Sequence, residues 1–213
     1  MPLSLLFCHG WAFTPAFWEP LAERLPELAQ MRDNAGYFGP AAAPEPRAPC
    51  LAITHSFGTM RLLAAPPPGL VGLVAIAGFD RFAAAREFTG VAPRVLDRMI
   101  GAFAQVPETV LADFHALIGS TMPTGKRNTE RLHADLLALR DGDMRYCAAT
   151  LGVPILSLQG AHDPLLGTGM RESVFAAAPR VMRRTHPLAG HLLPIEDPDW
   201  CADAIRAFAE TLA

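Results

Sequence analysis

The stretch LAITHSFGTM, residues 51–60, joins a buried strand to a helix through a serine. Residues 50–55 are a short apolar run of the kind that forms a buried parallel strand, and the residues after Ser56 are typical of a helix. A serine in such a sharp turn presents its hydroxyl above the sheet, beside the free N–H groups of the helix N-terminus. The motif for this turn is G-x-S-x-G. Here Gly58 is present but Thr54 replaces the first glycine, so a structural serine remains an alternative.

Strand and helix signals alternate along the rest of the chain. Apolar runs predict strands at residues 3–10, 50–55, 70–79, 153–160 and 180–187, with a strand remnant followed by a Gly/Pro loop in residues 30–49. Helical spacing of apolar residues predicts helices at residues 14–29, 56–65 and 197–213. This alternation predicts an α/β fold, with a mostly parallel sheet and helices on both of its faces.

The segment between the third and fourth of these strands has no strand signal. Two parts of it, residues 92–119 and 129–143, show apolar residues at helical spacing. We therefore expect a helical lid at about residues 80–148. The length of 213 residues favours one domain that spans residues 1–213 and includes this insertion.

The composition of the chain argues against several classes of function. It is 51% hydrophobic and 18% charged, with a net charge of -3 and no long run of one sign, which argues against a nucleic-acid partner. No apolar run has the length of a membrane span, and the N-terminus has no basic region typical of a signal peptide. The cysteines form no CxxC pair and no zinc spacing. These features predict a cytoplasmic protein with reduced thiols and no metal.

A base and an acid that suit Ser56 follow later in the chain. Asp163 stands after the fourth strand in QGAHDPLL, and His191 stands after the fifth in LAGHLLPIEDP. The carboxyl ends of parallel strands form sites together, and the order Ser, Asp, His is the one that serine hydrolases use on such sheets. FCHGW ends the first strand, so the backbone N–H groups of Trp11 and Phe57 are candidates for an oxyanion hole.

The motifs CHGW, THSFGT, LQGAHDPL and AGHLLPIEDP together resemble the α/β-hydrolase superfamily. Within it, the HGW start, the lid sequence of residues 86–119 and LLALRDGDMR are similar to the pimeloyl-[acyl-carrier-protein] methyl ester carboxylesterases of biotin synthesis. The resemblance implies Ser56 as nucleophile, His191 as general base and Asp163 as its partner. It also implies the Trp11 and Phe57 amides as the oxyanion hole, a helical lid, a carrier-bound methyl ester as substrate, and no cofactor.

The chain also departs from the family pattern. The usual first β-hairpin is missing, and the segment of residues 30–49 is short and lacks the familiar D-x-x-G-x-G-x-S run. We expect a sheet that is trimmed at its N-terminal edge. Thr54 in place of glycine predicts looser packing between strand and helix.

Several residues keep a plainer interpretation beside the functional one. Asp163 in HDP has a common turn composition, and Asp141 and Asp143 are rival acids that precede the fourth strand. His9 is interpreted as a structural support of the oxyanion turn. For His55, the sequence leaves open whether the side chain lines the pocket or packs outward.

The lid offers two further hypotheses. The Trp11 ring is expected to line the acyl pocket, and the apolar underside of the lid is expected to include Met99, Phe103, Phe114 and Met122, although ordinary packing between lid helices accounts for these residues equally well. The basic cluster consists of Lys126, Arg127, Arg131 and Arg140. It is either a solvated helix face or a docking site for an acidic acyl carrier protein.

The predicted function is a monomeric serine carboxylesterase. A thioesterase, a lactonase or a C–C bond hydrolase on a small acyl substrate would use the same three residues. A non-catalytic binding protein with this fold usually lacks one of the three, whereas Ser56, Asp163 and His191 are all present.

Overall fold

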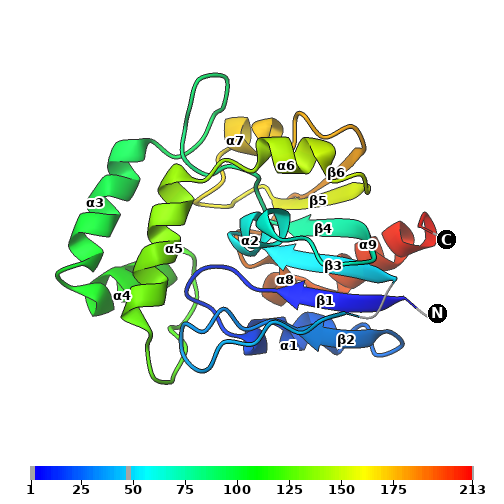
Figure 1. Cartoon of the computed structure of the whole chain (residues 1–213), viewed down its shortest axis with the longest axis horizontal. Helices are drawn as coiled ribbons and strands as arrows, with labels where there is room; N and C mark the ends of the chain where they lie inside the picture. Colours follow the sequence, from blue (N-terminus) through cyan, green and yellow to red (C-terminus); the bar gives the residue numbers. More distant parts are fainter. Residues whose placement is uncertain (1–2, 47–48, 213) are drawn as a thin grey trace.

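The strands that the structure describes form one parallel sheet (Figure 1). The computed structural model of the chain describes residues 3–46 and 49–212. Its strands lie in the order β2-β1-β3-β4-β5-β6, and each neighbouring pair is parallel. Their bounds are β1 Ser4–Cys8, β2 Ala29–Arg32, β3 Cys50–His55, β4 Leu70–Ile76, β5 Ile155–Gly160 and β6 Val181–His186. The expected α/β class and parallel sheet are confirmed.

The direction of the strand order changes at β1. The chain passes from β1 to β2 on one side, and then crosses to β3 on the other side of β1. In open α/β sheets a crevice forms at the carboxyl ends of the strands that flank such a switch point. The turn after β1 and the turn after β3 therefore lie beside one another, and they contain the HGW sequence and Ser56.

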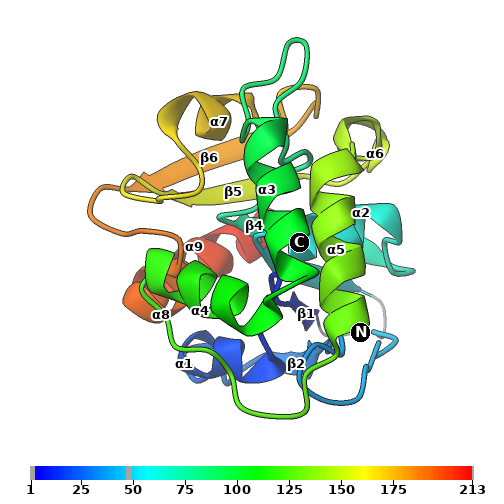
Figure 2. The same cartoon turned by 90° about the vertical axis from the view of Figure 1, so that its left-hand side faces the viewer.

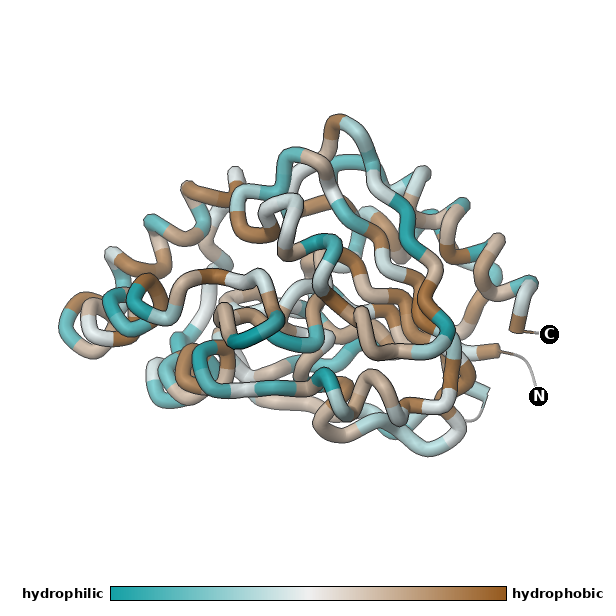
Figure 3. The backbone as a smooth tube through the Cα atoms, turned by 90° about the horizontal axis from the view of Figure 1, so that it is seen from above, coloured by the Kyte–Doolittle hydropathy of each residue, from teal (hydrophilic) through white to brown (hydrophobic). Residues whose placement is uncertain are grey.

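Burial along the strands explains the strength of their sequence signals. Every residue of β1, β3 and β5 is buried, because helices cover both faces and leave no solvated side for polar residues. The edge strand β6 reads VMRRTH and is mostly exposed, so its apolar pattern is weak. Figure 3 colours the backbone by hydropathy, and hydrophobic segments run through the interior of the molecule.

Helices cover the sheet in two layers. Their bounds are α1 Glu19–Ala22, α2 Gly58–Ala64, α3 Pro93–Phe103, α4 Pro107–Leu117, α5 Thr129–Asp141, α6 Arg145–Thr150, α7 Thr168–Ser173, α8 Leu193–Glu196 and α9 Pro198–Glu210. On one face, residues of α1, α8 and α9 such as Ile205 share a core with Phe7 of β1. On the other face, residues of α2 such as Met60 share a core with lid residues such as Phe103.

The helical insertion between β4 and β5 is present. Its helices α3, α4 and α5 stand together at one end of the sheet (Figures 1 and 2), and α3 packs against both of the others. The first part of the expected range is different, because residues 81–91 form an irregular strap with short bridges between Ala83 and Val91 and between Ala85 and Phe88. The lid helices thus begin at Pro93 and not at residue 80.

The helix expected at residues 14–29 is shorter than the sequence pattern predicted. The structure has a 3₁₀ turn at Pro15–Trp18 followed by the single-turn helix α1. The apolar spacing of Phe17, Leu21 and Leu25 is still used, since all three side chains are buried. Pro26 explains the early end, because proline removes a helix hydrogen bond and disfavours helical conformation in the residue before it.

Candidate active site

Ser56 lies in a strained turn between β3 and α2. Its φ of 52° is in the left-handed region, which costs a non-glycine residue on the order of 1–3 kcal/mol unless its surroundings hold it. The Ser56 N–H donates to the Ile76 carbonyl at 3.1 Å, and the Ser56 carbonyl accepts from the Thr59 N–H at 3.0 Å. Both backbone groups are therefore fixed, and the hydroxyl is presented at the end of the sheet.

Close packing around this turn depends on Gly58. A Cβ at that position would lie 2.3 Å from the Cys8 carbonyl oxygen and 2.6 Å from the His9 carbonyl oxygen. Both are backbone atoms of β1 and its turn. Only glycine lets the start of α2 approach the β1 turn so closely.

Thr54 does not loosen the packing, so that expectation was wrong. Its side chain is fully buried, and its hydroxyl donates to the Val74 carbonyl at 3.2 Å. The Thr59 hydroxyl in turn donates to Thr54 Oγ1 at 2.7 Å. Space for this pair comes from Gly78, where a Cβ would lie 2.3 Å from Thr59 Oγ1. The threonine pair fills the strand–helix contact and satisfies its own polar atoms.

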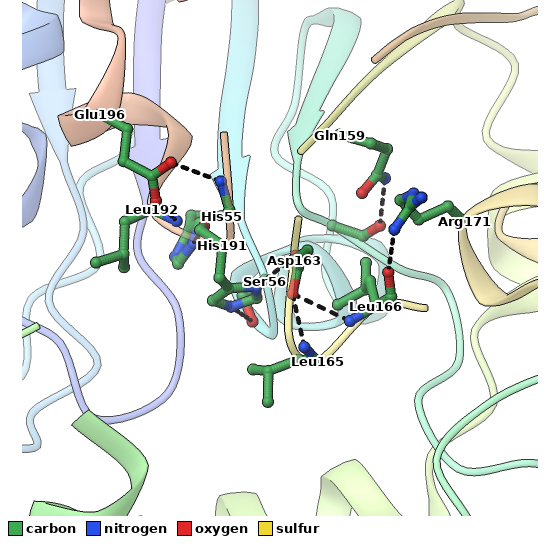
Figure 4. Close-up of polar contacts among 12 residues, drawn as sticks. His55, Ser56, Gln159, Asp163, Leu165, Leu166, Arg171, His191, Leu192 and Glu196 are labelled. Carbon is green, nitrogen blue, oxygen red and sulfur yellow. Dashed lines mark hydrogen bonds and ion pairs between the residues drawn. The ribbon is translucent and has the colours of Figure 1, made fainter. Parts of the chain in front are cut away.

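The structure brings Asp163, His191 and Ser56 together (Figure 4). His191 Nδ1 lies 2.8 Å from Asp163 Oδ2, and His191 Nε2 lies 3.1 Å from Ser56 Oγ. The three side chains come from loops after β5, β6 and β3, which end at the same edge of the sheet. Since Nδ1–H donates to the carboxylate, the Nε2 lone pair faces the hydroxyl. This arrangement allows Nε2 to accept the serine proton.

Asp163 is held in its charged form. Burial acts to raise the pKa of its carboxyl group, but the charge of His191 and several hydrogen bonds outweigh burial and lower the pKa below its usual value. Two of these bonds come from the N–H groups of Leu165 and Leu166, which donate to Oδ1 at 2.8 Å and 3.0 Å. The rival acids are engaged elsewhere, because Asp141 pairs with Arg140 and Asp143 with Arg145.

The two candidate oxyanion donors lie on the turns that flank the serine. In the described part of the chain, neither the Trp11 N–H nor the Phe57 N–H has a hydrogen-bond acceptor. The turn after β1 packs directly on the serine, since a Cβ at Gly10 would lie 3.1 Å from Ser56 Cβ. Unpaired N–H groups beside a hydroxyl are the arrangement that stabilises negative charge on a tetrahedral intermediate.

His9 supports the β1 turn, as expected. Its Nδ1–H donates to the Gly10 carbonyl at 2.9 Å, and its Nε2 accepts from the Ala35 N–H at 3.2 Å. Burial lowers the pKa of His9, which keeps the ring neutral. Both nitrogens are thus used in holding the turn.

Comparison with known proteins finds relatives in sequence and neighbours in structure. No family model matches the chain. It is 25% identical over 240 residues to the pimeloyl-[acyl-carrier protein] methyl ester esterase of Pectobacterium atrosepticum, covering 97% of this chain and 94% of that protein. It is 26% identical over 242 residues to the biotin biosynthesis bifunctional protein BioHC of Cellvibrio japonicus, covering 98% of this chain but only 48% of that longer protein.

The solved structures with a similar backbone include an esterase from Exiguobacterium antarcticum. That structure matches with a TM-score of 0.82 at 15% identity, over 98% of this chain and 92% of the other. A bromoperoxidase from Bacillus anthracis matches with a TM-score of 0.83 at 12% identity, over 99% and 92%. The chain has the α/β-hydrolase fold. Together with the relatives named as esterases, this supports a hydrolytic enzyme.

The cavity of the chain lies between Ser56 and the lid. Its volume is about 460 Å³, and its lining is mostly apolar. Trp11, Met99 and Phe114 are among the residues that line it. The Trp11 indole N–H donates to the Leu132 carbonyl of α5 at 2.9 Å, which fixes the ring against the lid.

Two of the expected pocket residues do not line this cavity. Phe103 is buried behind Trp11, with 6.0 Å between the ring centroids, and belongs to the packing between lid and core. Met122 lies in the loop after α4 and is 41% exposed. The cavity lining also includes residues that the sequence analysis did not predict. They lie in loops after strands or in α5: Phe79, Phe82, Leu136, Leu139, Pro164 and Leu165.

The basic cluster is largely neutralised by carboxylates. Arg127 pairs with Glu108 at 2.6 Å and Arg131 with Asp135 at 3.1 Å. Arg140 pairs with Asp97 and Asp141. Of the four residues, Lys126 alone has no ion pair within the described part of the chain. The structure therefore provides less free positive charge on the lid than the sequence suggested.

The structure shows no sign of a metal site in the residues it describes, where no group of three or more potential ligands occurs. Its cysteines, Cys8, Cys50, Cys147 and Cys201, are free thiols. Burial raises the pKa of Cys50 to about 11, which leaves that thiol protonated and unreactive. None of the described helices is both long and apolar enough to cross a membrane.

Proposed function

We propose that this protein is a serine carboxylesterase that works through an acyl-enzyme. The observation that supports it best is the continuous set of hydrogen bonds from Asp163 through His191 to Ser56, beneath an apolar cavity. His191 and Asp163 have no exposed side-chain surface. Such burial strengthens the electrostatic interaction between them.

The reaction follows from this geometry. Ser56 Oγ attacks the ester carbonyl while its proton passes to His191 Nε2, and Asp163 stabilises the resulting imidazolium. The Trp11 and Phe57 N–H groups bind the oxyanion. His191 then gives the proton to the departing alcohol, which leaves Ser56 acylated. A water molecule, deprotonated by His191 in the same way, releases the acid and restores the serine.

For the substrate, we propose the methyl ester of a pimeloyl chain on acyl carrier protein. Two observations support it: relatives along nearly the whole chain are named as esterases of this substrate, and an apolar cavity above Ser56 suits a linear acyl chain. A lactonase remains the second candidate, since an enol-lactonase from Burkholderia xenovorans shares the fold with a TM-score of 0.67. We place the activity in the cytoplasm and propose a monomer that binds the carrier protein through the basic lid residues.

The test compares wild-type protein with Ser56→Ala. Both are incubated with pimeloyl-carrier-protein methyl ester and with p-nitrophenyl esters, and free acid is measured by mass spectrometry. We expect Ser56→Ala to keep its melting temperature and to lose roughly 10³-fold or more in kcat. A variant that retains a tenth of the wild-type activity would rule out the serine mechanism. If Ser56-dependent hydrolysis is seen with the small esters alone, the proposed esterase activity is supported and the proposed carrier-bound substrate is refuted.

A further inference from the structure

The backbone around His191 is held by a carboxylate from α8. Glu196 Oε2 accepts from the Gly190 N–H at 2.5 Å, and Glu196 Oε1 accepts from the Leu192 N–H at 3.1 Å (Figure 4). These two amides belong to the residues directly before and after His191. One side chain thus bridges the peptide groups on both sides of the residue that contacts Ser56.

The carbonyl of His191 is held by a second side chain, that of His55 at the end of β3. His55 Nε2–H donates to the His191 carbonyl oxygen at 2.9 Å. His55 is fully buried, and its ring packs against Phe13, Phe17 and the ring of His191, with 4.9 Å between the two imidazole centroids. The side chain neither lines the cavity nor packs outward, which answers the question that the sequence left open.

The protonation state of His55 follows from its partner. A carbonyl oxygen only accepts hydrogen bonds, so Nε2 must carry the proton. Nδ1 then carries none, and it has no hydrogen-bond partner among the described residues. Burial, followed by the nearby charge of His191, holds the pKa of His55 well below its usual value. His55 is a neutral donor that adds no positive charge beside a base that becomes positive during the reaction.

We propose that His55 and Glu196 are positioning residues that fix His191 at the distance and angle its reaction with Ser56 needs. This inference rests on the proposed function. Asp163 sets the orientation of the imidazole ring, but it does not fix the loop from which the ring projects. Gly190 precedes His191 and gives that loop wide conformational freedom. The two side chains remove this freedom by binding the Gly190 and Leu192 amides and the His191 carbonyl.

The expected effect is large because catalysis is sensitive to small displacements. His191 Nε2 lies 3.1 Å from Ser56 Oγ, near the upper limit of a good hydrogen bond. A misplacement of about 1 Å can cost on the order of 100-fold in rate. Loss of either side chain should therefore lower kcat and leave substrate binding, which depends on the lid cavity, nearly unchanged.

The test uses Glu196→Gln, His55→Leu and His55→Gln, with Glu210→Gln as the matched control. Glu196 is an exposed residue, so its variant does not depend on refilling the core. A glutamine there can accept a hydrogen bond from only one of the two N–H groups. Its own NH₂ group then faces the other N–H, which loses its acceptor. His55→Gln keeps a neutral N–H donor of similar reach, whereas His55→Leu removes it. Glu210 is an exposed glutamate at the end of α9, far along the helix from the His191 loop.

Kinetics on p-nitrophenyl acetate and labelling of Ser56 by a fluorophosphonate decide the outcome. We expect Glu196→Gln and His55→Leu to lower kcat roughly 10- to 100-fold with KM within twofold, and labelling to slow in parallel. His55→Gln should recover most of the loss, and Glu210→Gln should match wild type. Unchanged kcat in Glu196→Gln, or a His55→Leu defect that His55→Gln does not rescue, overturns the positioning role. Activity that survives Ser56→Ala would instead overturn the proposed function itself.

Discussion

Gly160, the last residue of β5, lies where the Asp163 loop passes the His191 loop. A Cβ at Gly160 would lie 2.1 Å from the Gly190 carbonyl oxygen and 2.4 Å from the Ala189 carbonyl oxygen. Carbon and oxygen atoms that are not bonded come no closer than about 3.3 Å in ordinary contacts. Because both oxygens are backbone atoms, Gly160→Ala must push the His191 loop away by about 1 Å.

That displacement acts directly on the reacting geometry. The two loops are joined by the His162 N–H, which donates to the Ala189 carbonyl at 2.9 Å, and by the Asp163–His191 pair. A shift of about 1 Å moves His191 Nε2 out of hydrogen-bond range of Ser56, for which we expect a loss of on the order of 100-fold in kcat. KM should change little, because the lid forms most of the cavity. Overpacking should also cost about 1–3 kcal/mol of stability.

Gly167→Ala provides the matched control. It lies a few residues further along the same connection, and a Cβ there would have no atom within 4 Å. Steady-state kinetics on p-nitrophenyl acetate and thermal melting are measured for both variants and for wild type. We expect Gly167→Ala to stay within twofold of wild type in kcat. If Gly160→Ala also keeps wild-type kcat and melting temperature, the close approach of the two loops does not set the position of His191.

Three further outcomes are expected. The free energy of unfolding, measured by urea titration, should fall as the pH drops below about 6.5. The slope should reach up to about 1.4 kcal/mol per pH unit for each buried histidine whose pKa is lowered, and a free energy of unfolding that does not change with pH would refute this. Burial lowers the folded-state pKa of His9, His55 and His115, so protons bind the unfolded chain first and stability is fully present only above the unfolded pKa. Ala102→Phe, which fills the cavity from α3, should lower kcat/KM for p-nitrophenyl octanoate about 10-fold, or about 1.4 kcal/mol, but spare p-nitrophenyl acetate; an equal effect on both would place the acyl chain elsewhere. Lys126→Glu should lower kcat/KM only for a carrier-bound ester and less so at high salt, and no change at low salt would remove the charge-based support for carrier docking.

The strands were predictable to the extent that they are buried on both faces. The stretch of residues 50–55 matches β3 in full, because a short continuous apolar run that ends in a turn is typical of a parallel strand covered by helices on both sides. The edge strand β6 gave a weaker signal because it is mostly exposed. The helix expected at residues 14–29 was too long, because the spacing of apolar residues shows neither that its first turn is a 3₁₀ turn, at Pro15–Trp18, nor that Pro26 prevents its continuation.

The candidate site was partly predictable because its order along the chain follows from the sheet. Ser56, Asp163 and His191 each lie in the loop that follows a strand, so the parallel topology alone brings these loops to one edge. The lid residues were not predictable in this way. Whether Phe103 faces the cavity or the core depends on how α3 is rotated against α5, which a helical repeat does not determine. The partners of Arg127 and Arg131 likewise depend on which helices meet.

The positioning contacts were missed for a related reason. Glu196 lies five residues after His191 in the motif itself, but a carboxylate that follows a histidine has no distinctive pattern. Its role appears only in the folded chain, where the single turn of α8 places Glu196 so that Oε1 and Oε2 accept from two N–H groups of the His191 loop. His55 stands beside Ser56 in the sequence, and period-two alternation in a strand places it on the face opposite to its neighbours. That face meets the His191 loop only in the folded sheet.

The exchange of glycine for Thr54 shows what the nucleophile motif requires physically. The first glycine of G-x-S-x-G provides space between a strand and the helix that follows it. A residue without a side chain at another position can provide the same space. Here a Cβ at Gly78 would lie 2.3 Å from Thr59 Oγ1 and 2.9 Å from Ala75 Cβ, so the missing side chain after β4 makes room for two threonines. Their hydroxyls then bond to each other and to the Val74 carbonyl, so neither hydroxyl is buried without a partner. The serine turn is therefore kept by a compensating glycine that lies outside the motif, just after the neighbouring strand β4.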